Sequence, residues 1–99
     1  MAKKTSRNTD ILRDSKRTTS PKIYSLLVEL VNEDRDDLAE DVLKIDYLLT
    51  YTSKCIKDKD LKEGRDTIKM AKARIDKLVE NQVNVEYLKY LYDGLNSQL

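Results

Sequence analysis

The stretch LAEDVLKIDYLLTYTSKCI, residues 38–56, carries the clearest structural pattern in this sequence. Apolar residues and one threonine recur along it at alternating intervals of four and three, at Leu38, Val42, Ile45, Leu49, Thr52 and Ile56. This spacing places the side chains on one face of an α-helix and forms a heptad seam, which suits packing along a nearly parallel or antiparallel helix. The stretch therefore predicts a long helix with a helical neighbour.

A second seam follows after the polar residues Lys57–Asp60. Its members recur at intervals of three and four: Leu61, Gly64, Ile68, Ala71, Ile75, Leu78 and Gln82. Asp60 and Glu63 resemble a capping box, with Asp in the place of Ser or Thr. Two seams joined by so short a polar connection predict an antiparallel helical hairpin, in which Gly64 and Ala71 permit close approach of the two helices.

Shorter helices are expected on both sides of the hairpin. Ser20 and Pro21 favour a helix start, and Asn84 is expected to cap the last helix. The acidic residues at 33–41 suit the first turn of a helix, so we place a break near residues 32–35. One continuous helix over 21–56 is the alternative. The expected inner faces are Ile23, Leu26, Leu27, Leu30 and Val31 in the first helix, and Val85, Leu88, Leu91, Tyr92 and Leu95 in the last.

The fold class is therefore all-α, a small antiparallel helical bundle of four helices, or of three with a long first helix. A length of 99 residues allows one small domain, which we place at 21–99. Residues 1–20 contain few apolar side chains and carry a net charge of +4, so we expect a disordered basic arm. Its basic residues are Lys3, Lys4, Arg7, Arg13, Lys16 and Arg17, and residues 21–99 sum to −3.

Several function classes are disfavoured by composition. The sequence has no His, one Cys and two Gly, which leaves no imidazole base, no Cys/His zinc cluster and no glycine-rich phosphate loop. We expect no catalytic activity, cofactor or metal site, and we attribute the acidic residues at 33–41 to a helix start. We expect Lys54 and Lys57 to lower the pKa of Cys55 slightly, but interpret Cys55 as a small apolar residue. A single cysteine, no apolar leader and no long apolar run favour a cytoplasmic protein without membrane contact.

Tyrosines that lie off the seams are the candidate contact residues. Tyr47 and Tyr51 share a face with Leu43, on the side of the helix opposite to its seam, and Tyr87 and Tyr90 lie off the inner face of the last helix. Either these residues are covered by a second neighbouring helix and the bundle edge, or they form an exposed partner site, for which tyrosine is well suited.

Two functions remain in competition. The leading hypothesis is a non-catalytic protein-interaction module, which means a small helical inhibitor, adaptor, immunity or regulatory protein of microbial, phage or plasmid type. The alternative is a nucleic-acid-binding accessory protein, whose six basic arm residues contact phosphates weakly. The basic residues of the third helix alternate with acidic ones, which is typical of a solvated face. A homo-oligomer is compatible with both functions.

The segment 23–95 resembles the four-helix bacteriocin immunity proteins, especially where 73–78 runs through 81–83 into 87–91. The likeness is one of helix and linker lengths and includes no diagnostic motif. It implies a four-helix fold and assigns no functional residues.

Overall fold

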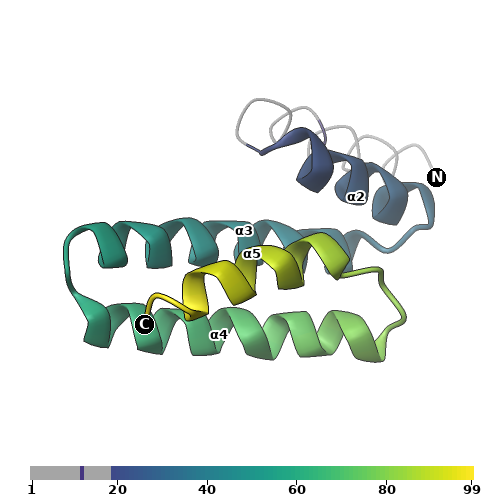
Figure 1. Cartoon of the computed structure of the whole chain (residues 1–99). Coiled ribbons are helices and arrows are strands. Elements are labelled where there is room, and N and C mark those ends of the chain that lie inside the picture. The colour runs from purple at the N-terminus through teal and green to yellow at the C-terminus, as the bar shows by residue number, and fades with distance from the viewer. Residues whose placement is uncertain (1–11, 13–18) are drawn as a thin grey trace. The chain divides into compact units, whose positions relative to one another are not determined.

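The computed structural model describes Leu12 and residues 19–99. Four α-helices and no strand occur in this part of the chain: α2 Pro21–Asn32, α3 Asp36–Lys57, α4 Leu61–Glu80 and α5 Glu86–Asn96 (Figure 1). The all-α prediction is confirmed. Because α2 and α3 are separate helices, the alternative of one continuous helix over 21–56 is wrong.

The chain divides into two compact units, one ending at Glu40 and the other formed by Asp41–Leu99, and each is described by itself. The boundary lies within α3. The arm predicted at 1–20 falls outside the described residues except for Leu12, Thr19 and Ser20, so its disorder stays a prediction.

Two of the predicted helix starts are confirmed. Ser20 Oγ accepts a hydrogen bond from the Ile23 N–H at 3.4 Å, and Pro21 is the first residue of α2. Asp60 Oδ1 accepts from the Glu63 N–H at 3.4 Å at the start of α4. The cap of α5 was predicted one residue too early: the N-cap is Val85, while Asn84 Oδ1 accepts from the Glu86 N–H at 3.1 Å.

The connections after α2, α3 and α4 share one backbone geometry that was not predicted. Each contains a non-glycine residue in the left-handed region: Asp34 with φ 60°, Lys59 with φ 63° and Gln82 with φ 63°. In each, the next residue donates its N–H back to the third-last residue of the helix, as in the 2.8 Å bond from Asp60 N to Cys55 O. This is the Schellman ending, which satisfies carbonyls that the helix leaves without partners.

In the unit ending at Glu40, α2 carries a buried stripe of Ile23, Leu27, Leu30 and Val31, as the spacing predicted. Leu26, predicted with them, is only half-buried. Asp36 and Asp37 occupy the first turn of α3, where carboxylates interact favourably with the helix dipole.

In the unit Asp41–Leu99, α3 and α4 run antiparallel, and α5 packs on α4 (Figure 1). The register is set by two contacts. Asp41 near one end of the hairpin pairs with Arg74 and Lys77, and Cys55 near the other end lies beside Gly64. Most members of the two predicted seams are buried here: Val42, Ile45, Leu49, Thr52, Gly64, Ile68, Ala71, Ile75 and Leu78.

The second seam is wrong at its two ends. Leu61 is 37% exposed and Gln82 is exposed, because each lies at or beyond a helix terminus. The buried threonines keep their hydroxyls satisfied within their own helices: Thr52 donates to Leu48 O and Thr67 to Glu63 O, both at 2.8 Å. None of the described helices has the length and apolar composition needed to cross a membrane.

Candidate partner-binding surfaces

The first candidate surface is the tyrosine pair Tyr47–Tyr51 on α3. The residues are four apart and therefore neighbours on the helix surface. Their rings stack with centroids 6.5 Å apart and an interplanar angle of 13°. Tyr47 is 63% exposed and Tyr51 38%, while Leu43 beside them is half-buried. In the structure a large aromatic surface thus faces solvent. The sequence alone did not decide between this exposure and burial against a second neighbouring helix.

Two carboxylates, those of Glu63 and Asp60, act on Tyr51. The pKa of Tyr51 is raised from its ordinary value, first by the carboxylate of Glu63, then by Cys55, by partial burial and by Asp60. Each of these makes a phenolate less favourable than a neutral phenol. A local potential of this sign favours a neutral or cationic contact over a phosphate.

The second candidate surface is the pair Tyr87–Tyr90 on α5. The rings stack with centroids 6.3 Å apart at an interplanar angle of 22°. Tyr90 is 72% exposed, whereas Tyr87 is half-buried. The two pairs lie on different helices, the first on α3 and the second on α5.

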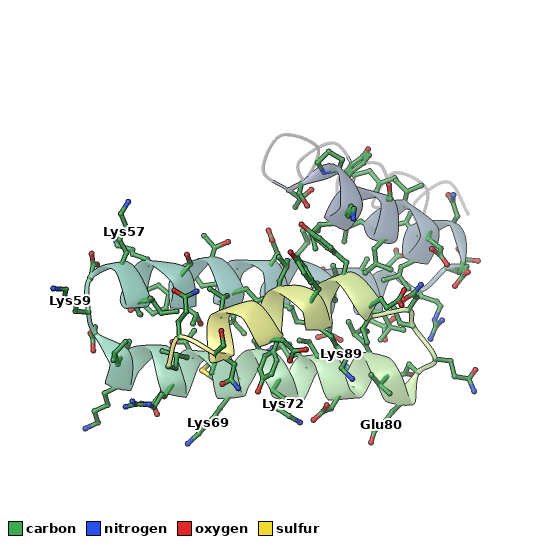
Figure 2. The ribbon with its side chains drawn as sticks, viewed as in Figure 1. Lys57, Lys59, Lys69, Lys72, Glu80 and Lys89 are labelled. Carbon is green, nitrogen blue, oxygen red and sulfur yellow. The ribbon has the colours of Figure 1, made fainter. Side chains whose placement is uncertain are left out.

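The basic residues of α4 are largely engaged within the protein. Arg74 Nη1 and Lys77 Nζ lie 2.9 and 2.7 Å from the two carboxylate oxygens of Asp41. Lys72 Nζ donates to Asp76 Oδ2 at 3.1 Å, which helps to raise the pKa of Lys72, and Arg65 donates to Leu99 O at 3.0 Å. Figure 2 shows Lys69 and Lys72 pointing away from α3. The interpretation of this face as solvated and internally paired is consistent with these contacts.

Asp41 was not singled out by the sequence. Its side chain is only 8% exposed, whereas Arg74 and Lys77 are 42% and 51% exposed. Arg74 donates a hydrogen bond to Asp41 Oδ1. Lys77 forms an ion pair with Asp41 Oδ2, but this contact is not a hydrogen bond. One aspartate within an acidic run carries no signal for such a role, because the partners are 33 or more residues away.

Cys55 is buried and is the free thiol of the chain. Its pKa is raised, mainly by burial and further by Asp60, Glu63 and Asp58, while Lys54 opposes the shift only in part. Lys54 lowers this pKa as expected, but burial and the carboxylates outweigh it, so the net shift of the pKa is upward. Among the described residues there is no group of three or more side chains suited to hold a metal ion.

The six basic arm residues, Lys3, Lys4, Arg7, Arg13, Lys16 and Arg17, lie outside the described residues. Their proposed contact with nucleic acid stays a prediction.

No protein-family model matches the chain, and neither the curated proteins nor the solved structures include a significant match. The resemblance to immunity proteins gains no support from these comparisons.

Proposed function

We propose that the protein is a non-catalytic protein-interaction module, of the inhibitor, adaptor, immunity or regulatory type, and that the Tyr47–Tyr51 pair on α3 is its contact surface. The observation that carries the proposal is the exposure of this stacked pair on a long, well-packed helix. Tyrosine supplies a large contact area, a polar tip and little side-chain entropy to lose, and it is enriched at protein interfaces.

The rigidity of the pair also supports this proposal. Tyr47 and Tyr51 belong to a helix whose residues Ile45, Leu49 and Thr52 are buried. The backbone that presents the rings is thus fixed by core packing, so binding requires little further ordering of the main chain. The pKa of Tyr51, raised by Glu63 and Asp60, supports a protein partner over a polyanion.

The experiment compares capture of proteins from a lysate of the source organism by three forms of the full chain. These are the wild type, a Tyr47→Ser/Tyr51→Ser variant, and a Tyr87→Ser/Tyr90→Ser variant as the matched control. Circular dichroism confirms that each form is folded. We expect the first variant to lose at least one partner about tenfold, which corresponds to ~1.4 kcal/mol and is typical of an interface hot spot.

The control variant is expected to retain that partner. If all three forms capture the same proteins equally, the Tyr47–Tyr51 surface is not the contact and the proposal fails. Treating the lysate with nuclease before capture removes proteins held only through nucleic acid. A gel-shift of the full chain at low salt then tests the alternative function of the basic arm; no shift of DNA or RNA would end it.

A further inference from the structure

The exposed aromatic surface of α3 has a carboxylate border at the start of α4. Tyr51 lies one turn before Cys55, whose Cβ would be 3.4 Å from a Cβ added to Gly64, so the end of α3 lies beside the first turn of α4. Glu63 directly precedes Gly64, and Asp60 is the N-cap of α4; both are exposed. The Glu63 carboxylate is also the group that raises the pKa of Tyr51 most. Aromatic rings from one helix and carboxylates from the next therefore meet at this end of the hairpin.

The neighbouring lysines leave the charge of this border uncompensated at Tyr51. Among the residues that the structure describes, no cation forms an ion pair with the Glu63 carboxylate. Lys54 lowers the pKa of Cys55, but it is not among the groups that shift the pKa of Tyr51. Figure 2 shows Lys57 and Lys59 pointing outward at the end of α3 and in the connection that follows. The field at the Tyr51 hydroxyl is therefore set by the carboxylates.

An arginine side chain fits both parts of this surface. Its guanidinium is planar and stacks on aromatic rings, while its N–H groups form a fork that matches a carboxylate. The ammonium of a lysine is a compact, strongly hydrated charge, so it makes the stacking contact less well. A phosphate or a carboxylate on the partner would be repelled by the border. Charge and shape together therefore favour arginine as the group that this surface receives.

We propose that the Tyr47–Tyr51 surface binds an arginine of the partner protein, whose guanidinium lies on the exposed tyrosine rings and pairs with the Glu63 carboxylate. This inference rests on the proposed function, because it names the chemistry of the partner at the same surface. The rings are accessible for such a contact, since Tyr47 is 63% and Tyr51 38% exposed. Glu63 lies outside the tyrosine pair, so its contribution can be tested separately from that of the rings.

Short peptides test this chemistry while the partner is unidentified. The probes are capped Gly-Arg-Gly-Arg-Gly and its counterparts with lysine or glutamate in place of arginine, titrated at low salt into the full chain and followed by NMR of the backbone amides. We expect the arginine peptide to shift the signals of Tyr51 and Glu63 and to bind about threefold more tightly than the lysine peptide. The glutamate peptide and a short oligothymidylate should leave these signals unchanged. Added salt should weaken binding of the arginine peptide, because it screens exposed charges.

Glu63→Gln is the decisive variant, because glutamine keeps the size of the side chain and is also suited to a capping box. We expect the dissociation constant of the arginine peptide to rise about threefold in Glu63→Gln, as for loss of an exposed ion pair. Tyr47→Ser/Tyr51→Ser should abolish the shift of the Glu63 signal. The matched control is Glu80→Gln, which removes an exposed carboxylate from the opposite end of α4 and should leave the constant unchanged (Figure 2).

The inference is overturned if the lysine peptide binds as tightly as the arginine peptide, if Glu63→Gln binds like the wild type, or if the oligothymidylate shifts the same signals. Adding Glu63→Gln to the lysate capture separates this inference from the proposed function. If the tyrosine variant loses a partner that Glu63→Gln keeps in full, the contact surface stands and the arginine contact is refuted. If the peptides behave as expected but no captured protein depends on the tyrosines, the proposed function fails, while the preference of the surface for arginine stands.

Discussion

Different interactions stabilise the two ends of the α3–α4 hairpin. At one end Asp41 is buried between the cations Arg74 and Lys77, with N–O distances of 2.9 and 2.7 Å. At the other end Gly64 lets the side chains of Cys55 and Leu99 approach α4, where Arg65 also donates a hydrogen bond to Leu99 O at 3.0 Å. The first end depends on compensating a buried carboxylate, and the second on shape. We therefore expect removal of charge to destabilise mainly the Asp41 end of the hairpin, and added volume to destabilise mainly the Gly64 end.

The largest effect is expected at the ionic end, from Arg74→Met/Lys77→Met. This variant leaves Asp41, 8% exposed, as a buried charge without its cations, which should lower the free energy of unfolding by about 3 kcal/mol. Urea unfolding measures the loss. Adding Asp41→Leu to the double variant should recover most of it, because an apolar group there needs no partner.

The matched control is Lys69→Met/Lys72→Met, which removes two exposed cations from the same helix. Its effect should stay below about 0.5 kcal/mol, as for exposed ion pairs. An equal loss in both double variants would show that burial of Asp41 does not distinguish this end.

At the close-packed end, Gly64→Leu should lower stability by about 2 kcal/mol, because added volume must displace Leu99 and push against Cys55. Gly64→Ala should be nearly neutral. The gain in helix propensity offsets a small shift of the Leu99 side chain, whose Cδ2 lies 3.0 Å from the new Cβ.

Cys55 reports on this end alone. Cys55 is 5% exposed and the pKa of its thiol is raised by burial, so alkylation needs local opening. Gly64→Leu should accelerate alkylation more than the double methionine variant does. The reverse order would mean that the two ends open as one unit.

The left-handed residues give a smaller effect of the opposite sign. Lys59 and Gln82, which follow the last residues of α3 and α4, have φ 63°. Glycine adopts this conformation without Cβ strain, so Lys59→Gly and Gln82→Gly should each raise stability by about 0.5–1 kcal/mol, measured by urea unfolding. Asn81→Gly is the control, because Asn81 has φ −96° and gains nothing from glycine. A similar gain in Asn81→Gly would remove strain as the explanation.

These elements separate the features that could be predicted from the sequence from those that could not. The seams predicted α3, α4 and their antiparallel pairing, because helical periodicity is a local property of apolar spacing. The left-handed endings were missed because no glycine signals them, and residues such as Lys59 adopt φ > 0 only when hydrogen bonding and packing impose it. The exposure of Tyr47 and the burial of Asp41 depend on residues that are distant in the sequence. Apolar spacing alone therefore could not decide whether Tyr47 is exposed, and it gave no indication that Asp41 is buried.

The smallest effect is expected between the two ends, at Asp46 of α3. Partial burial raises the pKa of Asp46 above its ordinary value of 3.8, so the folded state binds the proton more tightly than the unfolded state. The stability from this preference is fully present below pH 3.8 and is lost as the pH rises through the folded pKa. Above that pKa the ionised carboxylate keeps its full desolvation penalty.

Asp46→Asn keeps the shape and removes the charge. It should raise stability at pH 7 by no more than about 0.5 kcal/mol, because solvent screens a half-buried group. The gain should vanish near pH 3, where the wild-type carboxyl is protonated. Urea unfolding at both pH values, with the exposed Asp66→Asn as control, measures the difference. If Asp46→Asn still raises stability at pH 3, the gain comes from packing or helix propensity and not from removal of charge. Charge compensation would then be important only at the Asp41 end of the hairpin.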